Sequence, residues 1–168
     1  SVVNHDPDAQ PDTVAVVEDS APSAIQVLAN DSDADGNPLI ITAVGAPAHG
    51  TTAFSAGSVA YTPAPDYFGP DSFTYTVSDG IGGTALGTVS VSVTNVNDSP
   101  VAASESYSAT EDTPLTVGVS GVLANDTDVD GNALTAILVT GAAHGSLTLN
   151  PNGSVTYVRT TNFAGSDG

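Results

Sequence analysis

The chain has 168 residues, of which 19 are acidic and one is basic, giving a formal net charge of −18 at pH 7. So negative a chain repels nucleic acid and anionic membranes, which excludes both as partners. It has no cysteine for a disulfide, no apolar run long enough to span a membrane, and no signal-peptide pattern at its start. A hydrophobic fraction of 40% in ordered alternation indicates a folded chain rather than a disordered one.

The predicted elements are all short β-strands, and no segment carries a helical period. Val89, Val91 and Val93 alternate with Ser and Thr, and the run from Phe73 to Val77 alternates in the same way, which is typical of half-buried strands. In chain order, strands are predicted over 14–17, 25–28, 39–44, 51–54, 58–62, 73–78 and 86–94, followed by a hairpin over 147–157 that turns at Asn152-Gly153. About seven short strands separated by Gly, Pro and Asp turns predict an all-β, antiparallel Greek-key sandwich of immunoglobulin type.

The sequence repeats itself. The segment VLANDSDADGN returns as VLANDTDVDGN, 95 positions later when counted from Asp33 to Asp128. Ala48-His49-Gly50 and Glu18-Asp19 also return, the latter as Glu111-Asp112. We therefore expect two modules of one kind, 1–98 and 99–168, arranged end to end. The second ends where the strand after Asp71 should begin, so it is expected to lack its last strands and the chain to come from a longer array.

The repeated segment is a loop of alternating oxygen ligands, Asp33, Asp35 and Asn37. Two carboxylates about 4 Å apart repel by about 4 kcal/mol at an effective dielectric of 20, so such a loop needs a compensating cation. Calcium takes six to eight oxygen ligands at flexible angles, whereas zinc prefers His or Cys. The alternative is a solvated Asx-rich turn. Recurrence in both modules favours calcium, although Thr42 stands where an EF-hand would carry its bidentate Glu.

Further motifs resemble those of cadherins. The segment VTNVNDSP at 93–100 resembles the cadherin interdomain linker, Glu18 resembles its strand-A glutamate, and Ser78-Asp79-Gly80 resembles its later Asp-Gly. As a whole the chain is similar to the cadherin-like, immunoglobulin-like tandem repeats, often called VCBS-type, of giant bacterial RTX adhesins. This resemblance implies calcium ions at module junctions on a bacterial cell surface.

The resemblance also implies the ligands. At the junction they would be Glu18, Asn95, Asn97, Asp98, Asp128, Asp130 and Asn132; at the N-terminal pole of the first module they would be Asn4, Asp33, Asp35, Asn37 and Asp79. Two positions depart from the family pattern, because Asn95 replaces an Asp and His5 stands where Asp98 should recur. Both departures reduce the negative charge, which implies fewer ions or weaker binding than in cadherins.

Other candidate groups point to structural roles. His49 and His144 are predicted to lie in turns, since no nucleophile or second His accompanies them. Asp66 and Asp71 could pair as acid and base, but Asp66 becomes Asn162 in the second module, so both are interpreted as loop or calcium-supporting residues. The aromatic residues are expected to pack in the core or between strands: Tyr61, Tyr67, Phe68 and Tyr157.

Two classes of function follow. In the favoured one, each module is a calcium-stiffened extender that projects an adhesive domain from a bacterial surface and supports adhesion or biofilm formation. In the other, the module itself binds polysaccharide or another copy of the adhesin. Neither class is an enzyme, and the partners implied are neighbouring repeats of the same chain.

Overall fold

The computed structural model describes residues 3–110 and 113–167. They fall into two compact units, Ser1–Val96 and Asn97–Gly168. Within the described residues the regular structure is β, apart from one 3₁₀ turn, η1 (Gly121–Leu123), and no helix there is long and apolar enough to cross a membrane. Glu111, which the repeat pairs with Glu18, lies outside the described residues.

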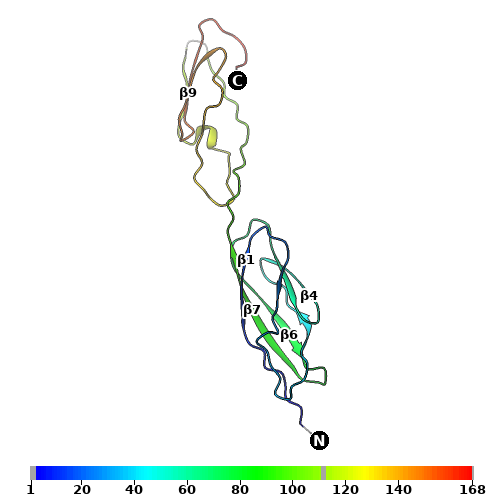
Figure 1. Ribbon diagram of the computed structural model, residues 1–168. Helices are drawn as coiled ribbons and strands as arrows, with labels where there is room; N and C mark the ends of the chain where they lie inside the picture. The colour runs from blue at the N-terminus through cyan, green and yellow to red at the C-terminus, as the bar shows by residue number, and fades with distance from the viewer. Residues whose placement is uncertain (1–2, 111–112, 168) are drawn as a thin grey trace. The chain divides into compact units, whose positions relative to one another are not determined.

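The first unit is a sandwich of two sheets (Figure 1). The larger sheet has four strands in the order β1 (Asp12–Val17), β7 (Thr84–Thr94), β6 (Gly69–Ser78) and β3 (Ile40–Val44). The smaller has three, in the order β2 (Ser23–Ile25), β5 (Val59–Pro63) and β4 (Gly50–Phe54). The all-β sandwich prediction is therefore confirmed, and most strand ends lie within two residues of the predicted positions.

The core of the first unit lies between its two sheets. The inward positions predicted from the alternation are all buried there: Phe73, Tyr75, Val77, Val89, Val91 and Val93. From the smaller sheet, Val59 and Tyr61 join the core, and the Tyr61 ring stacks on Phe73 with 6.0 Å between centroids. Each such side chain contributes about 1.5–3 kcal/mol by leaving water, so this unit has a substantial core of its own.

One strand pair contradicts the prediction of a wholly antiparallel sandwich. β1 runs parallel to β7, with Asp12 opposite Val89 and Val17 opposite Thr94. Parallel neighbours need a long crossover connection. The chain supplies one because it leaves β1 for the smaller sheet and returns to β7 only after β6. Alternation along a strand gives its buried face but not the direction of its neighbour.

The second unit carries one three-stranded sheet, with the order β8 (Leu115–Val117), β10 (Val155–Arg159) and β9 (Gly145–Leu149). The predicted hairpin is confirmed, since Leu149 pairs with Val155 and Gly153 takes a φ of 82° in the turn. In the part of this unit that the structure describes, no strand follows β10. Ile137 and Val139, which lie outside this sheet, are 79% and 92% exposed.

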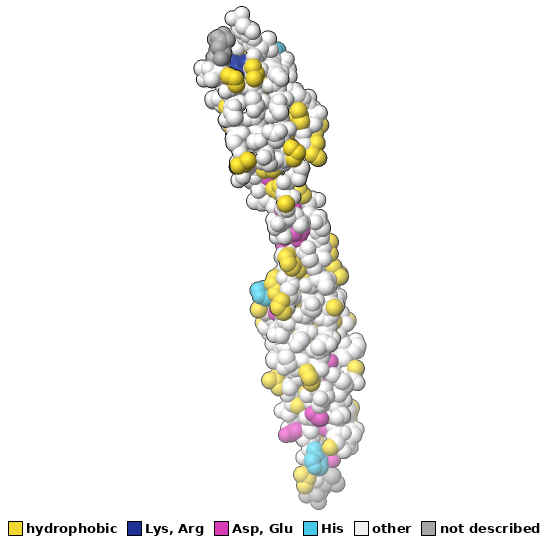
Figure 2. All heavy atoms as spheres, turned by 90° about the vertical axis from the view of Figure 1, so that its left-hand side faces the viewer, with side chains coloured by type: hydrophobic (Ala, Val, Ile, Leu, Met, Phe, Trp, Pro, Cys, Tyr) yellow, Lys and Arg dark blue, Asp and Glu magenta, His cyan; other side chains and the backbone are white. Residues whose placement is uncertain are grey.

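Apolar side chains also reach the surface elsewhere in the chain. On the face drawn in Figure 2 they form small groups separated by polar side chains and backbone. Groups of this size are ordinary for soluble proteins and do not in themselves mark a binding surface.

Gly87 is required by the core of the first unit. It lies opposite Tyr75 in the β6–β7 pair, and a Cβ at this position would collide with the Tyr75 ring. Gly87→Ala is therefore expected to lower the free energy of unfolding of the first unit by about 1–3 kcal/mol, because a packed core does not yield to an inserted methyl group. Urea unfolding followed by first-unit amide signals measures this. Gly57→Ala is the matched control, since a Cβ there meets open space and should change stability by no more than about 0.5 kcal/mol.

Candidate metal centre

The acidic loop of the first unit is closed by its own first carboxylate. Asp33 Oδ1 accepts hydrogen bonds from the backbone N–H of Asp35 at 2.9 Å and of Asn37 at 3.1 Å. Gly36 completes the turn with a φ of 76°, a conformation that glycine adopts without strain. The other oxygen, Asp33 Oδ2, is buried and has no hydrogen-bond partner among the described residues. Asp33 thus forms the Asx turn with one oxygen and presents the second as a free ligand atom.

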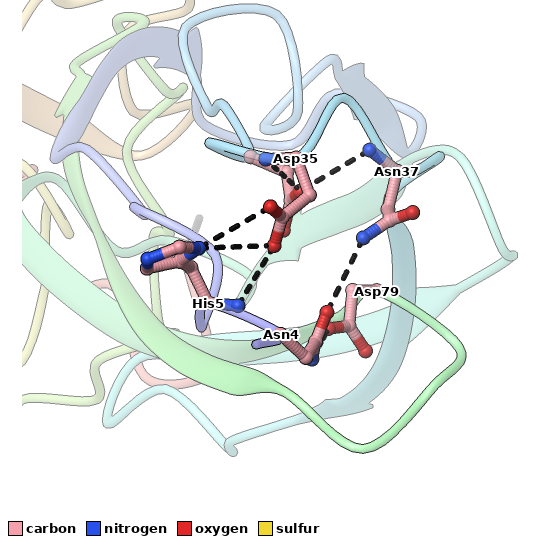
Figure 3. A network of polar contacts seen from close by, with 6 residues as sticks. Asn4, His5, Asp35, Asn37 and Asp79 are labelled. Atoms are coloured by element: carbon pink, nitrogen blue, oxygen red, sulfur yellow. Dashed lines mark hydrogen bonds and ion pairs between the residues drawn. The ribbon is translucent and has the colours of Figure 1, made fainter. Parts of the chain in front are cut away.

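The second carboxylate of the loop is held by the segment that enters the unit (Figure 3). Asp35 Oδ2 accepts the backbone N–H of His5 at 2.8 Å, and the His5 Nδ1 atom lies 3.2 Å from both Asp35 oxygens. The backbone hydrogen bond, with help from the imidazole, lowers the pKa of Asp35. The carboxylate therefore remains ionised at neutral pH, and His5 stands close enough to compete with a cation for it.

Asp79 and two amide side chains complete the cluster. Asp79 Oδ2 accepts the Asn4 side-chain amide at 2.6 Å, and Asn4 Oδ1 in turn accepts the Asn37 amide at 3.4 Å (Figure 3). Asp79 Oδ1 accepts three backbone N–H groups of residues 81–83, at 2.9, 3.1 and 2.9 Å. The hydrogen bond from Asn4, together with those N–H groups, lowers the pKa of Asp79. Both Asp79 oxygens thus have partners, so this residue supports its own loop as well as the charge of the cluster.

The second unit builds a matching cluster from the predicted residues. Asp128 Oδ1 accepts the backbone N–H of Asn132 at 3.0 Å, and Asp130 Oδ2 accepts that of Asp98 at 2.7 Å. The Asn132 amide donates to Asn97 Oδ1 at 2.8 Å. Five candidate ligands from two segments of this unit therefore come together.

Three hydrogen bonds of the first cluster recur in the second. Asn97 takes the place of Asn4, since each accepts a hydrogen bond from the side-chain amide of the loop Asn. Asp98 takes the place of His5, since each donates its backbone N–H to the second Asp of the loop. The exchange of His5 for Asp98 replaces an imidazole with a carboxylate. The cluster of the second unit is therefore the more negative of the two at this position.

Glu18 and Asn95 lie at the other end of the first unit. The Glu18 backbone N–H donates to Thr94 O at 3.0 Å, and Glu18 Oε1 accepts the backbone N–H of Val96 at 2.5 Å. This fixes the carboxylate beside the residues with which the first unit ends. Asn95 is exposed directly after β7.

The donor sets fit calcium. They consist of carboxylate and amide oxygens on flexible loops, which are hard ligands of the kind calcium takes in numbers of six to eight. The buried, unpartnered Asp33 Oδ2 is costly unless a cation compensates it. Asp33, Asp35, Asn37 and Asp79 are the residues that would hold the ion in the first unit, and Asp98, Asp128, Asp130, Asn97 and Asn132 those in the second.

Asp31, an acidic residue of the same loop, has a structural role. Asp31 turns away from the cluster and accepts the backbone N–H of Gln10 at 2.8 Å and the buried Tyr75 hydroxyl at 2.9 Å. Its counterpart Asp126 accepts the backbone N–H of Ala103 at 2.8 Å. Neither Asp31 nor Asp126 was among the predicted ligands, and the structure gives both of them structural contacts. The contacts with Gln10 and Ala103 lie next to the isolated β-bridges Asp8–Ser32 and Val101–Thr127, which sequence spacing does not reveal.

Asp71 lies in strand β6 rather than in a loop, which corrects the loop half of its interpretation as a loop or calcium-supporting residue. Only 8% exposed, it accepts the backbone N–H of Ala48 at 3.1 Å, of His49 at 3.0 Å and of Ser72 at 2.8 Å, and the Tyr61 hydroxyl at 2.8 Å. Asp167 repeats this arrangement in the second unit, where it accepts from Ala143, His144 and Tyr157. The sequence indicated this shared arrangement, because both modules carry an Ala-His-Gly segment followed by a Tyr and then an Asp.

The turn histidines and the aromatic residues can now be placed. The His49 ring stacks on Tyr67 at 3.9 Å between centroids, and His144 stacks on Phe163 at 4.1 Å. Tyr61 is buried in the core as expected, whereas Phe68 is 46% exposed and therefore does not belong to the core.

The sequence matches two protein-family models. The model described as "Bacterial Ig domain" matches residues 4–92, and the one described as "Bacterial cadherin-like domain" matches residues 97–168. The chain matches no curated protein sequence.

A solved structure shares the fold at low sequence identity. The human desmocollin-1 ectodomain aligns with a TM-score of 0.52 at 12% identity, over 98% of this chain and 33% of that one. Extracellular cadherin domains 3–6 of protocadherin gamma B2 align with a TM-score of 0.45 at 10% identity, over 94% of this chain and 39% of that one. An endo-fucoidan hydrolase of glycoside hydrolase family 107 aligns with a TM-score of 0.43 at 21% identity, over 92% of this chain and 24% of that one. The chain spans about a quarter to two fifths of the length of these structures.

Proposed function

Because the chain belongs to the bacterial immunoglobulin-domain family through residues 4–92, with a bacterial cadherin-like match over the rest, we propose that it is a calcium-binding extender segment of a large bacterial cell-surface adhesin. Calcium at the module poles stiffens the array and so projects an adhesive domain outward, in adhesion or biofilm formation. Its partners are neighbouring repeats, its location is extracellular, and its role is mechanical rather than catalytic.

The unpartnered Asp33 Oδ2 is the observation that carries the calcium assignment. An ionised carboxylate oxygen withdrawn from water, without a hydrogen bond, is strongly destabilising. The surrounding loop offers Asp35 and Asn37 as further oxygen ligands. Calcium at ten times its dissociation constant would add about 1.4 kcal/mol per site, if the site exists only in the folded unit.

The position of Glu18 supports calcium at the junction between modules. Its carboxylate is fixed to the backbone N–H of Val96. Asn97 and Asp98, which belong to the cluster of the second unit, follow Val96 directly in the chain. Consecutive Cα atoms are about 3.8 Å apart. An ion bound by Glu18 and by this cluster would therefore hold both bodies, whereas an ion inside one loop would stabilise that loop alone.

The mutation Glu18→Ala tests the shared ion. Interdomain order at saturating calcium should fall to that of the chelated chain, because the ion loses its ligand from the first module, while both units stay folded. Residual dipolar couplings measured separately for residues 3–96 and 97–167 report the order of each body. Equal alignment of the two units in Glu18→Ala and in the unaltered protein would contradict a junction ion.

The same change at Glu111 is the matched control. Glu111 occupies the corresponding place in the second module and would serve the junction with a following module. Its substitution should leave this junction as ordered as in the unaltered protein. Loss of order in both variants would indicate a general effect of removing charge.

The alternative function, binding of polysaccharide or of another adhesin copy, has less support. A sugar platform needs neighbouring exposed aromatic rings, whereas Tyr61 and Tyr75 are buried and Tyr67 is covered on one face by His49.

A further inference from the structure

The turn that joins β9 to β10 places an asparagine directly before a glycine. Asn152-Gly153 is the one Asn-Gly pair in the sequence, and Asn152 is exposed. Two backbone hydrogen bonds close the turn, from Gly153 N–H to Asn150 O and from Asn150 N–H to Ser154 O, each at 2.9 Å. Because glycine has no Cβ, nothing shields its backbone nitrogen from the side chain of the residue before it. A reaction between the Asn152 side chain and this nitrogen is therefore sterically open.

The Asn152 carboxamide is held in place by Ser154. Its Oδ1 atom accepts the backbone N–H of Ser154 at 3.1 Å and the Ser154 hydroxyl at 2.8 Å. The first bond closes an Asx turn, which folds the carboxamide back over the peptide bond between Asn152 and Gly153. The hydroxyl is oriented by Asn150, whose side-chain amide donates to Ser154 Oγ at 3.0 Å. Two donors thus converge on one carbonyl oxygen, the arrangement that stabilises an oxyanion.

We propose that Asn152 is a site of spontaneous covalent modification, at which asparagine is converted to aspartate and isoaspartate. The backbone nitrogen of Gly153 attacks Cγ of Asn152, and the two Ser154 donors stabilise the negative charge that develops on Oδ1. The C–N bond of the carboxamide then breaks, and ammonia leaves with the proton that the Gly153 nitrogen has lost. Before it attacks, this nitrogen releases its hydrogen bond to Asn150 O, which lies at a hairpin tip where local opening requires little free energy.

The succinimide ring that results takes up one water molecule and opens at either of its two carbonyl groups. Cleavage of the new bond between Cγ and the Gly153 nitrogen gives aspartate, with the backbone path unchanged. Cleavage between the backbone carbonyl carbon of Asn152 and that nitrogen gives isoaspartate, in which the chain runs through Cβ and Cγ. Both products add a negative charge, but only the second lengthens the backbone.

Other asparagines of the chain provide internal controls. Asn150 and Asn37 each precede a proline, whose nitrogen carries no proton and cannot form the ring. In the first unit the corresponding turn is closed by a hydrogen bond from Ser55 N–H to Ser58 O, and residues 55–58 contain no asparagine. The modification therefore distinguishes the hairpin of the second unit from its counterpart in the first.

The isoaspartate product is expected to loosen the contact between the hairpin and η1. Gly153 O accepts the backbone N–H of Val122 at 3.0 Å, and a Cβ on Gly153 would collide with Ser120 O. An additional backbone carbon directly before Gly153 displaces that residue from a contact that has no spare room. Aspartate leaves the backbone path intact and so preserves the contact.

Ageing of the 168-residue chain in mildly alkaline heavy-oxygen water, followed by mass spectrometry of a peptide that contains residues 145–159, tests the proposal. We expect Asn152 to be the first asparagine converted, with one oxygen taken from water. Ser154→Ala keeps the Asn-Gly pair but removes the hydroxyl donor, so its folded chain should react about fivefold more slowly. In concentrated urea, where the turn is absent, the two chains should react within about twofold of each other.

Hydrogen exchange at the Val122 amide measures the structural consequence. The separated isoaspartate form should lose protection there, whereas Asn152→Asp, which carries the same charge on a normal backbone, should keep it. Conversion confined to the urea-unfolded chain, or earlier conversion of another asparagine, would overturn the site. Equal rates for folded Ser154→Ala and the unaltered protein would overturn the role of the turn, and retained Val122 protection in the isoaspartate form would overturn the loosening.

Discussion

Replacing Asp71 with alanine is expected to lower the free energy of unfolding of the first unit by about 3–5 kcal/mol. The carboxylate accepts four hydrogen bonds, three from backbone N–H groups and one from Tyr61, and is 8% exposed. Its removal leaves those donors unsatisfied in a site that water reaches poorly. Each such loss costs about 1–3 kcal/mol, and the local structure relaxes to recover part of it.

The same carboxylate makes the first unit sensitive to acid. Burial by itself raises the pKa of Asp71, but the hydrogen bonds from Tyr61, Ser72, His49 and Ala48 together hold the pKa below its usual value. A lowered pKa in the folded state means that the stabilisation is complete above the unfolded pKa, near 3.9, and disappears as the pH falls through the folded value. The difference in stability between the unaltered protein and Asp71→Ala should therefore be constant at neutral pH and shrink in acid.

Urea unfolding of both proteins across pH, followed by first-unit amide signals, measures these effects. Asp8→Ala is the matched control, since Asp8 is exposed and lies in the same unit; it should change stability by no more than about 0.5 kcal/mol. A difference between Asp71→Ala and the unaltered protein that grew in acid would show that the carboxylate is destabilising in the folded state.

Replacing Asp33 with asparagine is expected to weaken calcium binding at the first-unit cluster by at least tenfold, or about 1.4 kcal/mol. The amide keeps an oxygen for the turn bonds to Asp35 and Asn37 but loses the charge of the buried Oδ2. Asp128→Asn should do the same for the second unit. The amide shifts of Gly36 and Gly131, titrated with calcium in one sample, report the two clusters separately.

Asp31→Asn discriminates between a specific ligand and general charge in the loop. Asp31 belongs to the same acidic segment, but its oxygens face Gln10 and Tyr75. This change should leave calcium affinity within about twofold. Equal weakening by Asp31→Asn and Asp33→Asn would mean that the loop attracts calcium only through its net charge.

Much of the fold follows from local pattern. The alternation in β6 and β7 gave their buried faces correctly because a half-buried strand has a period of two. The Asn152-Gly153 turn was also correct, because glycine is favoured at the positive φ that Gly153 adopts. The parallel pairing of β1 with β7 was not predictable from local pattern, since it depends on the path of the chain between the two sheets.

The candidate site was predictable as a set of residues but not as a division of roles. Repetition showed that Asp33 and Asp35 belong with Asn37, and the structure brings them together. Asp31 and Asp71 instead each accept a hydrogen bond from the hydroxyl of a core tyrosine. Such partners lie far away in sequence, so composition and spacing alone do not separate a candidate ligand from a buried acceptor.

Thermal unfolding in chelator and in millimolar calcium is the most direct test of the metal assignment. Extracellular modules bind calcium at dissociation constants of about 0.1–1 mM, and a gain of about 1.4 kcal/mol per site corresponds to a rise of several degrees in Tm for a unit of this size. We predict that rise with calcium, a smaller one with magnesium, and its loss when Asp33 and Asp128 are both replaced by asparagine. Identical unfolding curves in chelator and in 10 mM calcium, about ten times the weakest of those constants, would contradict the assignment.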